Sequence, residues 1–330
     1  MVKVAINGLG RIGRAVLKNL LDEPGFEVLA VNDLIDAQNL AYLLSYDTAY
    51  GRYPKRVAAG DGALRIDDRS IRLESEPEPA RLPWGELDVD GVFECTGRFT
   101  DKTGLRGHIE AGAKLAILSA PAKDPDILTV VHGVNQPEGN PEMISCASCT
   151  TNCIAPLVEI VGRRFGMRKA SLNTVHAYTS SQSVVDGPHK KPRRGRAAGA
   201  NLVPTSTGAA KATTQVLPGY TDRFDGVAVR APIPVGSIAD LVFLLDRDVT
   251  VDEVNRVLEE EAASERYDAV LGTSNDPLVS ADVIGDPRAS LVDLGMTQVI
   301  DGDLLRLMAW YDNEWGYANQ MIREARRLLQ

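Results

Sequence analysis

A glycine-rich turn near the N-terminus restricts the fold of this 330-residue chain more than any other feature, and it reads Gly8-Leu9-Gly10-Arg11-Ile12-Gly13. A short apolar run at residues 2–6, typical of a buried strand, precedes the turn, and apolar residues at helical spacing follow it as far as Pro24. A second apolar run at 27–31 leads to Asp33, twenty residues past the last glycine. The glycine pattern alone is a weak signal, but the strand, the helix and the acid together predict a dinucleotide-binding βαβ unit.

Each part of this unit has its own physical reason. Gly8 permits the tight turn, Gly10 lets the backbone approach a pyrophosphate, and Gly13 allows the helix to pack closely on the strand. The N-terminus of the helix favours negative phosphates. Asp33 can accept a hydrogen bond from a ribose 2′-hydroxyl and would repel a 2′-phosphate, so NAD is favoured over NADP.

The rest of the first half alternates between strand-like and helical stretches, which indicates an α/β fold with a Rossmann-type, doubly wound parallel sheet. Such sheets bind ligands beyond the carboxyl ends of their strands. Thr96 and Ser119 each stand just past a strand and are candidate cofactor contacts, although a turn or cap residue would fit either position equally well. The expected strands are 91–94, 115–118 and 127–131, and the expected helices are 36–44 and 101–111.

The second half predicts a separate domain, since a chain of this length exceeds the size at which a single core stops growing. Its β-like runs are longer and its helices fewer, which indicates an α+β domain with a mostly antiparallel sheet and helices on one face. Thr250 and Glu253 form a capping box before one helix. The expected strands are 171–176, 226–230, 238–245, 290–294 and 304–311, and the last helix is expected at 314–329.

Between the two halves, Cys149 stands where an extended run gives way to a helix-like run from Ile154. Unpaired N–H groups at a helix start favour a thiolate, which is the nucleophilic form, and can hold an oxyanion. On this evidence alone, a small residue filling a helix start fits equally well. The chain has four cysteines, too few for a disulfide scaffold, and no His or Cys cluster completes a zinc pattern, so we expect no metal and a reducing, cytoplasmic location. The cysteines are Cys95, Cys146, Cys149 and Cys153.

The chain has only four histidines, and one of them fits the role of a base. His108 in a helical stretch and His189 in a basic loop are expected to be solvated, and His132 to be structural. His176 ends a β-like run, which gives it a fixed position. A nucleophilic cysteine needs a base near it in space, and His176 is the best candidate.

Two further segments are suited to binding anions. Residues 204–210 place hydroxyls, including that of Thr207, and free N–H groups at the start of an expected helix, and Arg230 ends a strand where it can grip a phosphate. An N-cap and a surface ion pair are the plainer interpretations. The basic run at 190–196 fits a contact with another subunit or with phosphates. A net charge of −9 argues against nucleic acid as the primary partner, and no apolar run reaches membrane-span length.

With these segments in view, the chain resembles the glyceraldehyde-3-phosphate dehydrogenase family along essentially its whole length. Several specific motifs occur in the order typical of that family. The matching segments are Ile6-Asn7-Gly8-Leu9-Gly10-Arg11-Ile12-Gly13-Arg14, Ser148-Cys149-Thr150-Thr151-Asn152, Val175-His176-Ala177-Tyr178-Thr179, Thr207-Gly208-Ala209-Ala210-Lys211 and Trp310-Tyr311-Asp312-Asn313-Glu314-Trp315-Gly316-Tyr317.

The resemblance implies a phosphorylating oxidation of D-glyceraldehyde 3-phosphate to 1,3-bisphosphoglycerate with NAD and inorganic phosphate, a reaction of glycolysis and gluconeogenesis. Cys149 would form a hemithioacetal and then a thioester, with His176 as the base. The remaining implied roles are the inorganic-phosphate site at Ser148, Thr150, Thr207 and Gly208, the substrate-phosphate site at Thr179 and Arg230, and NAD contacts at Gly8, Gly10, Arg11, Ile12, Gly13, Asp33, Thr96, Ser119 and Asn313.

The resemblance also implies a homotetramer, with the loop at 178–201 at a subunit interface, and a discontinuous NAD-binding domain. The expected domains are 1–148 with 314–330 for NAD and 149–313 for catalysis. Departures from the usual pattern include Cys146 in place of asparagine, Cys95 in place of serine and Ser180-Ser181 in place of an Asn-Asp pair. Gly187 replaces a leucine common in strictly NAD-dependent members, so dual use of NAD and NADP remains open.

Two rival functions can be weighed against this one. Erythrose-4-phosphate dehydrogenase is a related enzyme whose thioester is hydrolysed, but the motifs around Thr179 and Thr207 that differ there are intact here. A binding protein that keeps the NAD domain and acts on RNA or other partners would tolerate drift of its catalytic residues. Cys149, His176 and Arg230 are all present, which favours the enzyme.

Overall fold

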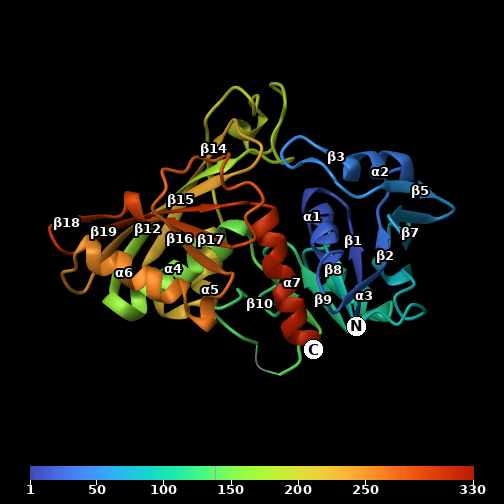
Figure 1. The fold of residues 1–330 in the computed structure, drawn as a ribbon, viewed down its shortest axis with the longest axis horizontal. Helices are drawn as coiled ribbons and strands as arrows, with labels where there is room; N and C mark the ends of the chain where they lie inside the picture. The colour runs from blue at the N-terminus through green and yellow to red at the C-terminus, as the bar shows by residue number, and fades with distance from the viewer. Residues whose placement is uncertain (138) are drawn as a thin grey trace. The chain divides into compact units, whose positions relative to one another are not determined.

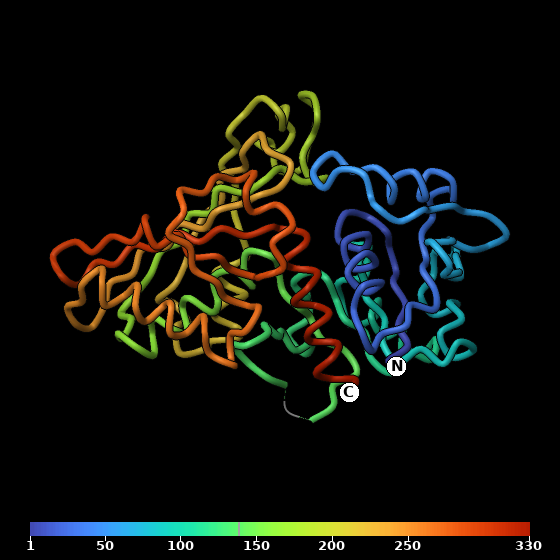
Figure 2. Tube along the Cα trace, viewed as in Figure 1, coloured from blue at the N-terminus to red at the C-terminus, as the bar shows by residue number. Residues whose placement is uncertain are grey.

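The structure is a computed structural model that describes residues 1–137 and 139–330. The chain forms two compact units. The first comprises residues 1–130, 136–147 and 318–330, and the second comprises 131–135 and 148–317. Figure 2 traces this path, in which the red C-terminal segment belongs to the same unit as the blue N-terminal strands.

The first unit contains a nine-stranded sheet among the described residues, in the order β10-β11-β9-β8-β1-β2-β7-β6-β5. All of its strand pairs from β10 to β7 are parallel, and β7, β6 and β5 pair antiparallel. The strands are β1 Val2–Asn7, β2 Phe26–Asn32, β5 Val57–Gly60, β6 Ala63–Ile66, β7 Arg69–Glu74, β8 Gly91–Glu94, β9 Leu115–Leu118, β10 Leu128–Thr129 and β11 Met143–Ser145, with a separate small pair of β3 Tyr46–Asp47 and β4 Gly51–Arg52.

Strand β1 lies between β2 and β8 in parallel register, so the sheet winds in opposite directions on its two sides. This confirms the doubly wound fold and places the crevice at the carboxyl end of β1. The expected strand at 127–131 is reduced to the two residues of β10 because its partner β11 offers only a short edge. Helices α1 Arg11–Leu20, α2 Ala37–Ser45 and α3 Lys102–Glu110 belong to this unit, as does most of the C-terminal helix described below.

The second unit contains a mixed sheet in the order β13-β14-β12-β15-β19-β17-β16, with β18 paired to β19. The pairs β12–β14 and β16–β17 are parallel, and the other described pairs are antiparallel, as expected. Buried and half-buried residues alternate along β15 and β19, because one face of the sheet packs on the core. The strands are β12 Met167–Ala177, β13 Val203–Ser206, β14 Phe224–Ala231, β15 Ser237–Leu245, β16 Leu271–Ser274, β17 Ser290–Asp293, β18 Gln298–Ile300 and β19 Leu304–Tyr311.

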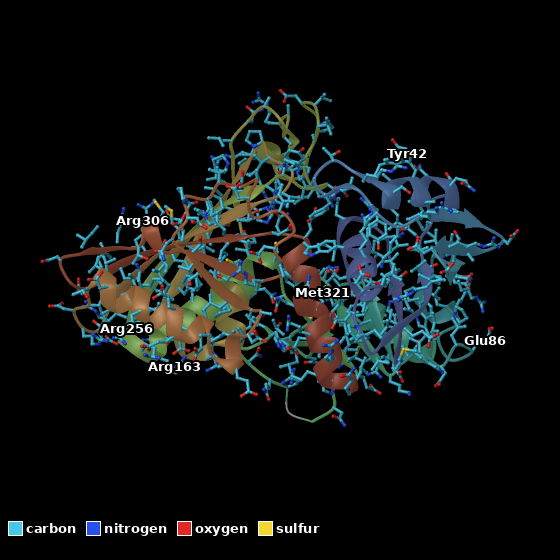
Figure 3. The ribbon with its side chains drawn as sticks, in the orientation of Figure 1. Tyr42, Glu86, Arg163, Arg256, Arg306 and Met321 are labelled. Atoms are coloured by element: carbon cyan, nitrogen blue, oxygen red, sulfur yellow. The ribbon has the colours of Figure 1, made fainter. Side chains whose placement is uncertain are left out.

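Helices α4 (Cys149–Phe165), α5 (Ala209–Val216) and α6 (Val251–Ala262) lie together against this sheet (Figure 1). Helix α4 contacts four strands and supplies much of the apolar core. The capping box is confirmed, since the Thr250 hydroxyl accepts a hydrogen bond from the Glu253 N–H. At the surface, Arg163 of α4, labelled in Figure 3, pairs with Glu261 of α6 at 2.8 Å.

The last helix, α7, spans Trp315–Leu329, close to the expected 314–329. Its Met321, also labelled in Figure 3, is fully buried. Short 3-10 turns occur at Pro79–Arg81, Pro192–Gly195, Pro218–Tyr220, Glu265–Tyr267 and Leu294–Met296. Within residues 1–137 and 139–330, no helix combines the length and the apolar character needed to span a membrane.

Candidate active site

Three glycines shape the turn between β1 and α1. Gly8 has a φ of 89°, a left-handed conformation that glycine adopts without steric cost. A Cβ on Gly13 would lie 1.9 Å from the Gly8 carbonyl oxygen, so only a hydrogen fits there. A Cβ on Gly10 would meet no atom within 4 Å. The turn is therefore tight at its ends and open above Gly10, where a phosphate needs space.

A pocket of about 270 Å³ adjoins this turn, and Gly8, Gly10, Asp33 and Thr96 all line it. The Asp33 carboxylate is held in place, because Oδ2 accepts the Leu9 N–H at 2.6 Å and Oδ1 accepts the Ile35 N–H at 3.1 Å. Among the described residues, no side chain caps the start of α1 at Gly10. A dinucleotide fits this arrangement, since the helix start offers N–H groups to a pyrophosphate and Asp33 offers a carboxylate to a ribose hydroxyl.

Four other expected cofactor residues of this unit, among them Gly13, lie outside the lining of that pocket. Arg11 and Ile12 form the first turn of α1, and Arg11 pairs with Asp47 at 2.5 Å. Ser119 follows β9, and its side chain acts to lower the pKa of the Cys95 thiol, which burial raises.

A network of buried polar side chains adjoins the pocket. It includes His108, for which the expectation was wrong. This side chain is fully buried, not solvated. Trp84 donates to its Nδ1 at 3.1 Å, and its Nε2 lies 3.1 Å from Glu94 Oε2. The other Glu94 oxygen accepts the Thr96 N–H at 2.8 Å, and Asn7 donates to Glu94 at 2.6 Å. Helical periodicity alone did not show that His108 faces these buried partners.

In the second unit, Cys149 is the first residue of α4. Ser148 is the N-cap, and its hydroxyl accepts the Thr151 N–H at 3.2 Å. The expected start of a helix at the thiol is therefore correct in geometry. Cys149 Sγ lies 3.4 Å from His176 Nε2, although the two residues are 27 positions apart in the sequence. A thiol and an imidazole at this distance can exchange a proton directly.

The orientation of His176 follows from its second ring nitrogen. Nδ1 lies 2.7 Å from the Ala177 carbonyl oxygen, which can only accept a hydrogen bond. A ring proton on Nδ1 would be donated to this oxygen and would leave Nε2 as a proton acceptor facing the Cys149 thiol. The imidazole ring also meets the edge of the Tyr311 ring, with centroids 5.9 Å apart.

Burial and the charge of Arg230 both act on the protonation of this pair. The parallel register of β12 and β14 sets Arg230 beside His176, and its Nη1 lies 2.6 Å from Nδ1 and 2.9 Å from the Ala177 oxygen. Burial, and then the charge of Arg230, lower the pKa of His176 to about 3. Burial also raises the pKa of Cys149, while Arg230 and Thr150 act in the opposite direction. In the ligand-free protein both shifts favour the neutral pair of thiol and imidazole.

The candidate phosphate residues lie in two places. Gly208 is the N-cap of α5, and Thr207 accepts the Ala209 N–H at 3.1 Å, so this helix start carries N–H groups toward an anion. Thr179 lies past the end of β12, where its hydroxyl is 2.8 Å from that of Ser181. Arg194, from the basic run, lies near enough for its charge to lower the pKa of both His176 and Arg230.

Sequence reasoning missed the partner of Thr150. Its hydroxyl lies 2.9 Å from the hydroxyl of the buried Tyr311, which is 161 residues later in the sequence. The Tyr311 hydroxyl is also 2.9 Å from that of Thr174. The alternation along β19 indicates that Tyr311 faces the core, but nothing in its local sequence names its partners.

The remaining site residues differ in surroundings. Cys153, one helical turn after Cys149, is fully buried with Sγ 3.6 Å from the Ser290 hydroxyl, and burial raises its pKa to about 12. Burial also raises the pKa of Cys146 well above its ordinary value. Asn313 Oδ1 accepts hydrogen bonds from the Ser237 hydroxyl at 2.9 Å and the Gly236 N–H at 3.2 Å, which orients its amide NH2 group away from them.

Comparison with known proteins gives matches over both halves of the chain. Residues 2–102 match the family model described as glyceraldehyde 3-phosphate dehydrogenase, NAD binding domain. Residues 148–313 match the model described as glyceraldehyde 3-phosphate dehydrogenase, C-terminal domain.

Three relatives, each named glyceraldehyde-3-phosphate dehydrogenase, illustrate the similarity. The protein of Clostridium pasteurianum is 45% identical over 330 residues, covering 98% of this chain and 97% of the relative. That of Streptomyces coelicolor is 46% identical over 325 residues, covering 97% and 96%. That of Geobacillus stearothermophilus is 46% identical over 324 residues, covering 97% and 96%.

Proposed function

The chain belongs to the glyceraldehyde-3-phosphate dehydrogenase family, and we propose that Cys149 and His176 are its catalytic pair. The protein is an NAD-dependent oxidoreductase of glycolysis that converts D-glyceraldehyde 3-phosphate and inorganic phosphate to 1,3-bisphosphoglycerate. The observation that carries the residue assignment is the 3.4 Å approach of Cys149 Sγ to His176 Nε2 at the start of α4.

The first step is attack of the Cys149 sulfur on the aldehyde carbon. His176 Nε2 takes the thiol proton, and the thiolate forms the carbon–sulfur bond of a hemithioacetal. The Nε2–H then donates to the oxyanion, and the N–H groups at the start of α4 can do the same. The oxyanion therefore forms where these N–H dipoles already point, which lowers the barrier.

The binding of substrate adjusts this pair through Arg230. We assign the phosphate of the substrate to Arg230 and Thr179. A bound phosphate offsets the charge that lowers the pKa of His176, so the imidazolium becomes easier to form once substrate is present. The pKa of His176 therefore rises when substrate is bound, which is when Cys149 has a proton to give.

Bound NAD would supply the hydride acceptor with which the hemithioacetal on Cys149 becomes a thioester. Gly8, Gly10, Gly13, Arg11, Ile12, Asp33, Thr96 and Ser119 would hold NAD in the first unit, and Asn313 would hold its carboxamide. Inorganic phosphate would then attack the thioester carbon from a site at Ser148, Thr150, Thr207 and Gly208, and the carbon–sulfur bond would break to release 1,3-bisphosphoglycerate and the Cys149 thiolate. Thr207 accepts the Ala209 N–H, and Gly208 has no side chain to cap the N–H groups that follow, which supports this site.

We further propose a cytoplasmic homotetramer with an NAD-binding domain at 1–148 and 314–330 and a catalytic domain at 149–313. Val184, Val185 and Leu202 support an interface near the 178–201 loop, because these apolar side chains are between 67% and 85% exposed. All four cysteines are free thiols, which fits a reducing compartment. Light scattering of the wild-type protein would test the tetramer directly.

The deciding experiment is NADH formation at 340 nm from glyceraldehyde 3-phosphate and NAD, with and without inorganic phosphate. We expect multiple turnovers only with phosphate, a single burst without it, and no product from Cys149→Ala. Steady turnover without phosphate would indicate hydrolysis, as in erythrose-4-phosphate dehydrogenase. Full activity in Cys149→Ala would overturn the assigned nucleophile.

A further inference from the structure

The network of buried polar side chains in the first unit connects two separate segments of the pocket lining. Thr96 stands in one segment, after β8, and Glu76 stands in another, after β7. Between them lie Asn7, Asn32 and Glu94, which are at most 4% exposed. These three residues end β1, β2 and β8, and they are register partners in neighbouring parallel strands. The network therefore lies at the edge of the sheet where a ligand binds.

Backbone groups of Glu76 fix the direction of the hydrogen bonds at one end of the network. Asn32 Oδ1 accepts the Glu76 N–H at 2.9 Å, and Asn32 Nδ2 donates to the Glu76 carbonyl oxygen at 2.9 Å. Nδ2 also donates to Asn7 Oδ1 at 2.7 Å. Because its oxygen faces Asn32, Asn7 must present its Nδ2 hydrogens to Glu94 Oε2, which lies 2.6 Å away.

Trp84 fixes the direction independently at the other end. The indole N–H can only donate, so His108 Nδ1, at 3.1 Å, is an acceptor and the ring hydrogen is on Nε2. That hydrogen faces Glu94 Oε2 at 3.1 Å. The Thr96 N–H donates to Glu94 Oε1 at 2.8 Å, and the Thr96 hydroxyl donates to the same oxygen while it accepts the Arg98 N–H.

Four hydrogens from the described residues thus converge on the Glu94 side chain, two on each oxygen. A carboxylate accepts all four. The amide of glutamine has the same shape, but it would accept two of them and direct its own N–H groups at the other two donors. A buried donor without an acceptor costs more than an ordinary hydrogen bond contributes, so the network requires a carboxylate at this position.

We propose that Glu94 is a positioning residue for NAD, whose carboxylate holds Thr96 and Glu76 where the adenosine half of the cofactor binds. The proposal rests on the assignment of this pocket to NAD, with Asp33 at the adenosine ribose. A Cβ on Gly8 would lie 2.7 Å from the Thr96 nitrogen, so Thr96 is packed against the glycine turn. The two segments are therefore ordered before the cofactor arrives, and binding carries a smaller entropic cost.

The test is calorimetric titration of the full-length, ligand-free protein with NAD and with ADP, which carries only the adenosine half. For Glu94→Gln we expect both dissociation constants to rise about tenfold, because the amide cannot satisfy the four donors. The KM for NAD should rise with them, while kcat at saturating NAD should change by less than about twofold. Alkylation of Cys149 by iodoacetamide without cofactor should keep its wild-type rate, since that thiol belongs to the second unit.

The matched control is Asp90→Asn, which changes a carboxylate next to the opposite end of β8. Asp90 accepts the Lys3 N–H at 2.8 Å and pairs with Lys114 at 2.6 Å, and neither partner lines the pocket. This variant should leave both dissociation constants unchanged. Thermal unfolding followed by circular dichroism would separate a loss of stability, which a merely structural role predicts, from a loss of affinity in the folded protein.

Reversal of one hydrogen bond gives a second, independent test. Asn7→Asp alone places an oxygen opposite Glu94 Oε2, where the donor was 2.6 Å away, and should also weaken ADP binding. In the double variant with Glu94→Gln, the new amide can donate to the new carboxylate. The double variant should therefore bind ADP at least about threefold more tightly than either single variant, although the His108 N–H still lacks an acceptor.

Wild-type affinity for ADP in folded Glu94→Gln, an equal loss in Asp90→Asn, or a double variant that binds no better than the single variants would overturn the proposal. If Glu94→Gln does not fold, Asn7→Asp and the double variant decide: restored ADP binding supports the direction of the bonds, and a double variant that also fails to fold contradicts it. A wild-type protein that binds neither NAD nor ADP would instead contradict the assignment of the pocket, which keeps the two failures distinct.

Discussion

The two units build their sites in opposite ways. In the first unit the turn from Gly8 to Gly13 depends on residues that have no side chain, since a Cβ at Gly13 would overlap the backbone and the space above Gly10 is open. In the second unit Cys149, His176 and Tyr311 work through side chains that come from α4, β12 and β19. The glycine turn is local in sequence and depends on open space, whereas the second site is assembled by the sheet from side chains that are far apart in the sequence.

The largest effect should come from removing one side chain in the second unit. Cys149→Ala should lower NADH formation by at least about four orders of magnitude, because no other group can carry the thioester. The comparison is sharpest against Cys153→Ala, one turn along the same helix. Cys153 is fully buried beside Ser290 and faces the core, so this variant should keep activity within about threefold of wild type.

Steady-state assays of the two variants, with circular dichroism to verify folding, would check this prediction. An equal loss in both variants would mean that the start of α4, and not the Cys149 thiol, is what the reaction requires.

Adding a Cβ at Gly13 in the first unit should have the next largest effect, here on the stability of the fold. Gly13→Ala places a Cβ 1.9 Å from the Gly8 carbonyl oxygen, and since both partners are backbone, neither can move cheaply. We expect the free energy of unfolding to fall by about 3 kcal/mol or more, measured by urea denaturation.

Gly10→Ala is the matched control, since its Cβ meets no atom and its φ of −63° suits alanine. It should fold normally but bind NAD about tenfold more weakly, because the methyl occupies the space above the helix start. Normal NAD affinity in Gly10→Ala would show that the phosphates lie elsewhere.

The same contrast explains what the sequence could predict. The glycine turn, the acid at Asp33 and the cap at Thr250 depend on neighbours within a few residues or on fixed spacing, and all three have the expected local geometry. The burial of His108 between Trp84 and Glu94 depends on how α3 packs on its sheet, which periodicity does not specify.

The contacts of Arg230 and Tyr311 could not be predicted from the sequence either. Sequence analysis named Arg230 as a phosphate ligand, but its contact with His176 depends on the parallel register of β12 and β14. The contact of Tyr311 with Thr150 depends on strand order across the sheet and on the placement of α4. Such long-range pairings follow from topology, so a single sequence shows the residues without their partners.

The buried imidazole of His176 should also change the free energy of unfolding, by less than Gly13→Ala does. The folded-state pKa of His176, about 3, lies below the usual value of 6.5, so the unfolded chain binds a proton that the folded chain rejects. The stability from this group is complete above about pH 6.5 and is lost progressively as the pH falls toward 3. Between pH 7 and pH 5 the loss should be about 2 kcal/mol.

The measurement is urea unfolding of wild type and His176→Asn at both pH values. Carboxylates titrate in both proteins, so the difference between the two proteins isolates His176. A difference that stays constant from pH 7 to pH 5 would show that the imidazole is not held neutral.

The smallest expected effect concerns a single charge beside the glycine turn. Asp33→Asn removes the negative charge that opposes a 2′-phosphate but keeps an oxygen that can accept a hydrogen bond, so the NADP-to-NAD ratio of kcat/KM should rise about tenfold. Gly187 replaces a bulky residue common in NAD-dependent members, so steric exclusion of the 2′-phosphate is weak and charge should dominate.

The matched control is Asp36→Asn, which removes the same charge three residues later, at the cap of α2, where asparagine caps equally well. A ratio that rises equally in both variants would mean that the general field of the unit sets the choice of cofactor. A rise confined to Asp33→Asn would assign that choice to one carboxylate.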